Sequence, residues 1–88
     1  MPVAPVTVYT SSFCGYCMRA LNLLQRRGIE YTEISVEDSP GLRDELVARS
    51  GRRSLPQIYL GERYLGDAEE LATMDRSGEL DRLLAESA

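Results

Sequence analysis

The two cysteines of this chain stand three positions apart, as Cys14-Gly15-Tyr16-Cys17. An alternating apolar segment precedes them and a segment with helical spacing follows, so the motif lies where a helix begins. Unpaired backbone N–H groups and the helix dipole favour an anion at such a position, and therefore a thiolate. The pattern indicates thiol–disulfide chemistry. The helical spacing puts Cys17, one turn deeper, on the buried face and leaves Cys14 at the exposed helix start. Cys14 would be the nucleophile, and Cys17 would resolve a mixed disulfide formed on Cys14.

Other interpretations of the cysteine pair have less support. A structural zinc site usually needs four Cys or His ligands, and this chain has two cysteines and no histidine. The missing histidine also excludes Ser-His and Cys-His catalysis. A disulfide that closes so short a loop constrains the unfolded chain little, so a purely structural bridge is weak too. Two inert buried thiols remain an alternative.

Composition predicts one small globular domain over residues 1–88, because 43% of the residues are hydrophobic and the length allows a single core. The net charge of −4 is uneven. Residues 1–60 hold seven Arg and six acids, a net +1, whereas residues 61–88 hold three Arg and eight acids, a net −5. An acidic chain of this kind argues against nucleic acid as a partner.

No segment has the apolar length needed to cross a membrane, so no membrane partner is expected. The N-terminal residues lack the basic region and apolar core of a signal peptide. We therefore expect a cytoplasmic protein, in a compartment where thiols are kept reduced and Cys-x-x-Cys pairs are usually catalytic or metal-binding.

Periodicity places secondary structure around the motif. Alternation predicts strands at 6–9 and 31–36, the second with Thr32, Ile34 and Val36 on one face. Helical spacing predicts a helix over 14–27, with Gly28 after its end. Ser39-Pro40 suits the start of a second helix, which Ser50-Gly51 would end. The order is strand, helix, strand, helix.

The second half of the chain predicts a hairpin and two short helices. Strands at 57–60 and 63–65 flank Gly61-Glu62, a pair suited to a tight turn. Asp67 can cap a third helix with Glu70 as its reciprocal partner. Ser77-Gly78 ends that helix, and a last one follows. A βαβ unit followed by a hairpin gives an α/β fold with a four-stranded mixed sheet, in the order βαβαββα, flanked by helices.

Three further segments could bind a ligand. Pro56 is either an ordinary proline at a strand edge or a cis proline beside the cysteines that exposes the Leu55 backbone to an extended ligand. The helix start at 67–69 could bind a carboxylate, although the local pattern favours simple self-capping by Asp67. Arg52-Arg53 could be a solvated pair or could hold a carboxylate near a thiol.

Together these motifs resemble the glutaredoxins, and the resemblance covers nearly the whole chain. It rests on the segments 8–10 and 14–17, 50–58, 66–71 and 74–81, which resemble small bacterial dithiol glutaredoxins with a Cys-Gly-Tyr-Cys motif. The resemblance implies a thioredoxin fold and an enzyme that reduces protein disulfides and glutathione–protein mixed disulfides. Its partners would be glutathione as cosubstrate and disulfide-containing or glutathionylated proteins. It implies a monomer with no tightly bound cofactor.

The resemblance also implies where glutathione lies. Its cysteine would face Cys14, and its backbone would pair with Leu55 beside Pro56. Its γ-glutamyl carboxylate would meet the N–H groups of Ala68 and Glu69. The remaining implied contacts are the Glu69 side chain on the γ-glutamyl ammonium, Tyr16 beside the groove, and Arg53 on the glycyl carboxylate, with Ser11 and Asp67 at positions where the family also contacts glutathione.

Several residues depart from the family pattern. Ser54-Leu55-Pro56 stands for the usual Thr-Val-Pro, Ser11 for a common lysine, and Gly15 for the proline of the motif. Residues 66–70 stand where the family usually has Gly-Gly-Cys-Asp-Asp. Asp67 therefore places a negative charge close to the expected carboxylate site, where like charges cost affinity.

Three alternatives stay open. The segment 12–17 also resembles mycoredoxins, so mycothiol or thioredoxin reductase could serve as the reductant. Some glutaredoxins without proline in the motif bridge a [2Fe–2S] cluster between two subunits, with Cys14 as the ligand that this chain would supply. A non-catalytic binding module that kept the fold is the third.

Overall fold

A four-stranded mixed sheet forms the centre of the structure, a computed structural model that describes residues 5–87. The strands are β1 (Val6–Thr10), β2 (Thr32–Ser35), β3 (Gln57–Leu60) and β4 (Arg63–Gly66). They lie in the order β2-β1-β3-β4. β1 and β2 are parallel, and the β1–β3 and β3–β4 pairs are antiparallel. This is the predicted mixed sheet, with the βαβ unit at one edge and the hairpin at the other.

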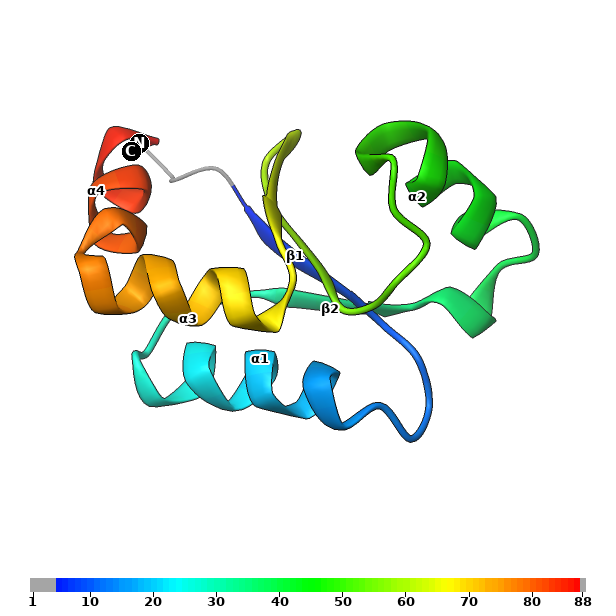
Figure 1. Cartoon of the computed structure of the whole chain (residues 1–88), viewed down its shortest axis with the longest axis horizontal. Coiled ribbons are helices and arrows are strands. Elements are labelled where there is room, and N and C mark those ends of the chain that lie inside the picture. Colours follow the sequence, from blue (N-terminus) through cyan, green and yellow to red (C-terminus); the bar gives the residue numbers. More distant parts are fainter. Residues whose placement is uncertain (1–4, 88) are drawn as a thin grey trace.

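Helices cover both faces of the sheet (Figure 1). α1 (Gly15–Arg26) and α3 (Ala68–Ser77) lie side by side against one face, and α4 (Glu79–Glu86) follows α3. α2 (Leu42–Ser50) lies on the other side, after a short 3-10 turn, η1 (Val36–Asp38). Within residues 5–87 no helix has both the length and the apolar character to cross a membrane.

Each face of the sheet has its own core. Val8 and Ile58 are fully buried beneath α1, α3 and α4, with Leu24 packed against them. On the opposite face Tyr59 is buried under α2, and its ring meets that of Tyr9 edge-on at 5.5 Å. Side chains alternate between these two cores because successive strand residues point to opposite faces.

Most predicted elements are confirmed to within a few residues, and two differ. Val36 belongs to the turn η1 instead of the strand, which ends at Ser35. The second helix begins at Leu42 and not at Ser39-Pro40. Gly41 has φ +84° and ψ −9°, and the Leu42 N–H donates to the Ser39 carbonyl at 3.2 Å. Pro40-Gly41 thus forms the centre of a type II turn. Because the positive φ of Gly41 is not helical, a helix cannot run from Pro40 through this residue, and α2 begins after the turn.

The junction between β4 and α3 depends on Gly66. Asp67 caps α3 by accepting from the Glu70 N–H at 2.9 Å, and Glu70 accepts from the Asp67 N–H at 3.1 Å. This is the predicted capping box. Gly66 has φ +128°, and a Cβ there would lie 2.6 Å from Oε1 of Glu70. Only glycine therefore allows both the backbone angle and the reciprocal cap.

We expect Gly66→Ala to lower the free energy of unfolding by about 1–3 kcal/mol, because it forces a disfavoured φ and displaces the Glu70 cap. Urea unfolding followed by circular dichroism measures the loss. Gly15→Ala is the control, since a Cβ at Gly15 meets nothing within 4 Å. It should leave stability unchanged or raise it by about 0.5–1 kcal/mol. Equal urea midpoints for Gly66→Ala and Gly15→Ala would contradict the requirement for glycine at position 66.

Candidate active site

Cys14 occupies the N-cap position of α1. Its Sγ accepts a hydrogen bond from the backbone N–H of Cys17 at 3.2 Å, and its carbonyl accepts from the Met18 N–H at 3.2 Å. The side chain is partly exposed, and both cysteines are free thiols. A sulfur that accepts a helix N-terminal N–H is stabilised as an anion by that donor and by the helix dipole. The structure thus places Cys14 where the sequence predicts a nucleophile.

Cys17 lies in a different environment one turn further along α1. Its side chain is only 2% exposed. Burial raises the pKa of the Cys17 thiol to about 12, and the neighbouring Cys14 sulfur adds to this rise through a hydrogen bond and its charge. Cys17 is therefore held as a neutral thiol beside a partly exposed Cys14. This is the predicted asymmetry of the pair.

A contact from η1 holds the loop that leads to Cys14. The Ser12 hydroxyl donates to a Glu37 carboxylate oxygen at 2.6 Å, and the Ser12 N–H lies 3.3 Å from the same oxygen. These hydrogen bonds lower the pKa of Glu37. Phe13, which follows Ser12 in the chain, has φ +57° and a fully exposed ring. The sequence pattern gives no sign of the Glu37 contact, because nothing local connects two residues 25 positions apart.

Pro56 faces the same sulfur from the other side. The Leu55–Pro56 peptide bond is cis, and the Leu55 carbonyl oxygen lies 4.0 Å from Cys14 Sγ. Pro56 itself is buried and directly precedes β3. The expectation of a cis proline beside the cysteines is confirmed.

A buried amide fixes the loop before Pro56. Nε2 of Gln57 donates to the Arg52 carbonyl at 2.7 Å and lies 3.3 Å from the Ser54 carbonyl. Its Oε1 accepts from the Tyr59 hydroxyl at 2.9 Å. Gln57 is fully buried, so its hydrogen bonds are made away from water, where a missing partner is costly. Sequence analysis assigned Gln57 only to a strand and gave it no such role.

The N-terminus of α3 combines the two roles that the sequence left open. Asp67 caps the helix through the Glu70 N–H, as the local pattern favours. The N–H groups of Ala68 and Glu69, however, have no acceptor within residues 5–87, as is usual for the first positions of a helix. They remain available to a carboxylate.

The two neighbouring arginines have different partners. Arg52 donates to Glu70 at 2.6 Å and lies 4.0 Å from an Asp67 oxygen. This ion pair lowers the pKa of Glu70 and offsets part of the negative charge at the helix start. Arg53 instead pairs with Asp44 at 3.1 Å, and both of these side chains are largely exposed. The sequence left Arg52-Arg53 open as a solvated pair or a carboxylate contact, and the family resemblance implied Arg53 as the contact of the glycyl carboxylate.

Two cavities contain most of the predicted site residues. One, of about 270 Å³, is lined by Tyr16, Ser54, Leu55, Pro56, Asp67, Ala68 and Glu69. We call it the exchange pocket. The other, of about 320 Å³, contains both cysteines and Ser11. Arg53 lines neither of them, and Ser11 lies away from the exchange pocket. Their assignments as ligand contacts therefore stay predictions without support from this geometry.

Among residues 5–87 no group of three His, Cys, Asp or Glu side chains is placed to hold a metal ion. This finding does not test the bridged-cluster alternative, because its ligands would come from two subunits and from glutathione.

Comparison with known proteins gives one consistent result. A family model described as glutaredoxin matches residues 6–65. A glutaredoxin of Pseudomonas aeruginosa is 43% identical over 81 residues, which cover 92% of this chain and 96% of the relative. Glutaredoxin 3 of Escherichia coli K12 is 37% identical over 82 residues, covering 93% and 99%. A crystal structure of a buckwheat glutaredoxin–glutathione complex superposes with a TM-score of 0.87 at 26% identity, covering 94% of this chain and 78% of that one.

The difference between the two thiols predicts selective alkylation. Iodoacetamide reacts with thiolates, and the raised pKa of Cys17 keeps that residue protonated well above neutral pH. We expect the folded, reduced protein to take up one alkyl group at about pH 8, on Cys14, as located by peptide mass spectrometry. Protein unfolded in urea, the control, should take up two. Rapid double labelling of the folded protein would contradict the proposed asymmetry.

Proposed function

Because this chain belongs to the glutaredoxin family of thiol–disulfide oxidoreductases, we propose that it reduces protein disulfides and glutathione–protein mixed disulfides with glutathione as the electron donor. The observation that carries this proposal is the position of Cys14. Its sulfur caps α1, lines a cavity together with the buried Cys17, and lies 4.0 Å from the carbonyl oxygen of Leu55, which lines the exchange pocket. The buckwheat relative, solved as a glutathione complex, supports glutathione as the ligand.

The first reaction is deglutathionylation. The Cys14 thiolate attacks the glutathione sulfur of a mixed disulfide, a new Cys14–glutathione disulfide forms, and the protein thiolate leaves and takes a proton. A second glutathione thiolate then attacks the glutathione sulfur on Cys14. This step releases oxidised glutathione and restores the Cys14 thiolate. The sum converts one mixed disulfide and one glutathione into a protein thiol and oxidised glutathione.

Protein disulfides require Cys17 as well. Attack by Cys14 on the disulfide gives a mixed disulfide and releases one substrate thiolate. Cys17 then attacks the Cys14 sulfur, which expels the second substrate thiolate and leaves a Cys14–Cys17 bridge for two glutathione molecules to reduce. Once Cys14 is part of a mixed disulfide, its negative charge is gone. One cause of the raised pKa of Cys17 is thereby removed at the step in which Cys17 must become a nucleophile.

The exchange pocket suits the rest of glutathione. Leu55 offers backbone groups beside the Cys14 sulfur, and the free N–H groups of Ala68 and Glu69 can bind the γ-glutamyl carboxylate. Tyr16 lines the same pocket. Arg52 reduces the repulsion that Asp67 would otherwise exert on that carboxylate, because its guanidinium lies within 4.0 Å of Asp67.

The two cysteines should separate in activity assays. With glutathione, glutathione reductase and NADPH, we expect Cys14→Ser to lose the reduction of a glutathionylated peptide completely. Cys17→Ser should keep that activity and lose most reduction of a protein disulfide. Parallel assays with mycothiol and with thioredoxin reductase as electron donors are the controls for the reductant. Activity in Cys14→Ser would overturn the assignment of Cys14 as the nucleophile. Faster turnover with another electron donor would overturn the assignment of glutathione as the reductant.

Asp67 allows a finer test of the pocket. Asp67→Asn removes the charge and keeps a good N-cap, so we expect the KM for glutathione to fall by about two- to fivefold with little change in stability. Asp67→Ala is the matched variant that removes the cap as well, and it should cost about 0.5–2 kcal/mol of stability. A higher KM in Asp67→Asn would show that Asp67 attracts glutathione, for example through its ammonium group.

A further inference from the structure

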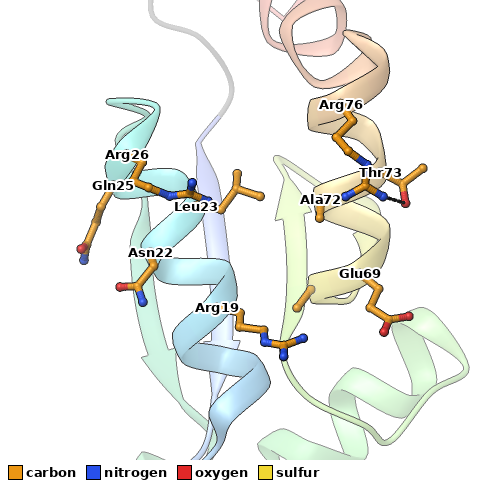
Figure 2. A pocket seen from close by; sticks show the side chains of 10 residues that line it. Arg19, Asn22, Leu23, Gln25, Arg26, Glu69, Ala72, Thr73 and Arg76 are labelled. Carbon is orange, nitrogen blue, oxygen red and sulfur yellow. Dashed lines mark hydrogen bonds between the residues drawn. The ribbon is translucent and has the colours of Figure 1, made fainter.

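A cleft of about 770 Å³ runs between α1 and α3, beyond the exchange pocket (Figure 2). Arg19 and Arg26 extend into it from α1, and Arg76 extends into it from α3. The buried side chain of Leu23 and the half-buried Ala72 form part of its floor. The cleft therefore has an apolar base and cationic walls.

The cationic walls are spaced along the helix axes. Arg19 and Arg26 are seven residues apart, about two turns, so they share one face of α1 and stand roughly 10 Å apart along its axis. Arg26 on α1 and Arg76 on α3 lie on opposite walls at the end of the cleft distant from Glu69 (Figure 2). One Nη of Arg76 lies 3.3 Å from the Thr73 hydroxyl, which steadies the guanidinium at the cleft.

These three arginines form no ion pair with any carboxylate of residues 5–87. Their neighbour Arg27, by contrast, is bound by both Asp75 and Asp81. Glu69 is the one acidic residue that lines the cleft, so three Arg and one Glu give the lining a net +2. The chain as a whole carries −4. A positive cleft in an acidic protein is complementary to a negatively charged ligand.

The cleft is continuous with the exchange pocket. Ala68 and Glu69 line both, and the Arg19 guanidinium lies 5.5 Å from the centre of the Tyr16 ring. A chain bound along the cleft would therefore lead into the pocket beside Cys14. The distance along α1 from Arg19 to Arg26 corresponds to about three residues of extended chain, which is more than one phosphate or carboxylate group can span.

We propose that this cleft binds an acidic, extended segment of the substrate protein and thereby directs a nearby disulfide or glutathionylated cysteine to Cys14. The inference rests on the proposed function for the chemistry at Cys14. Arg26 and Arg76 contact the acidic side chains, and Arg19 holds the chain where the cleft meets the pocket. The protein thus selects substrates by the charge of the sequence that flanks the reactive cysteine.

Glutathionylated peptides test this selection. The peptides carry the same modified cysteine and differ in a flanking run, which is glutamates in one peptide and glutamines in the other. Each of the two is made in two versions, one with the run before the cysteine and one with the run after it. For at least one placement we expect the kcat/KM of the unsubstituted protein to be about five- to twentyfold higher for the glutamate peptide at low ionic strength. Added salt should reduce this preference.

Arg26→Gln/Arg76→Gln should reduce the preference to about twofold or less, because the two cations at that end of the cleft are removed. Arg63→Gln/Arg43→Gln is the matched control, since both residues are exposed, lie outside the cleft, and change the net charge equally. Reduction of hydroxyethyl disulfide, which is small and uncharged, should be the same in all variants. Equal kcat/KM for glutamate and glutamine peptides with the unsubstituted protein would overturn the proposal.

Direct binding provides a readout that does not depend on catalysis. A glutamate peptide with serine in place of cysteine should shift the amide NMR signals of α1 and α3 along the cleft, and less so in Arg26→Gln/Arg76→Gln. If these shifts occur while peptide reduction is absent, the proposed function fails and the binding site stands. Shifts caused by inorganic phosphate but not by the peptide would overturn the proposal in favour of a small-anion site. Shifts that follow protein concentration alone would overturn it in favour of a second copy.

Discussion

The hydrogen bond from the Cys17 N–H to the Cys14 sulfur connects the fold of this protein to its chemistry. It caps α1, so the helix that covers one face of the sheet begins at the nucleophile itself. The same donor and the helix dipole stabilise negative charge on that sulfur. One turn later the helix buries Cys17, where burial raises the pKa of the thiol. A single helix start thus gives the two thiols opposite properties.

The rest of the active site depends on the parallel arrangement of α1 and α3. The two helices lie side by side and begin at the same end of the molecule (Figure 1). Both N-termini therefore direct positive ends toward one place, the first to a thiolate and the second to the free N–H groups of Ala68 and Glu69. Leu55, held by the Gln57 hydrogen bonds to its loop, closes the space between them. An extended, anionic thiol compound suits this combination of donors.

The arginines of the chain divide into structural and available groups. Arg27 connects α1 to the two C-terminal helices through Asp75 and Asp81, and Arg52 offsets the acidic start of α3. Exposed ion pairs of this kind contribute little stability individually, so their main effect here is to set the local charge. Arg26 and Arg76 form no ion pair with a carboxylate of residues 5–87, so their positive charge is available to a ligand in the cleft that adjoins the exchange pocket. This distribution gives the lining of one groove the opposite sign to the net charge of the chain.

The sequence by itself determined the features that depend on contacts within a few residues. The helix start at Cys14, the burial of Cys17 and the Asp67–Glu70 capping box follow from local spacing and helix geometry. The start of α2 at Leu42 was missed because two local motifs competed at Ser39-Pro40-Gly41, and the type II turn formed. Only the tertiary structure decided that Arg52 and not Arg53 meets the start of α3, that Glu37 holds Ser12, and that Arg26 and Arg76 line one cleft from two helices. The physical reason is that periodicity fixes which face of an element is buried, whereas the partner of a long polar side chain depends on how distant elements pack.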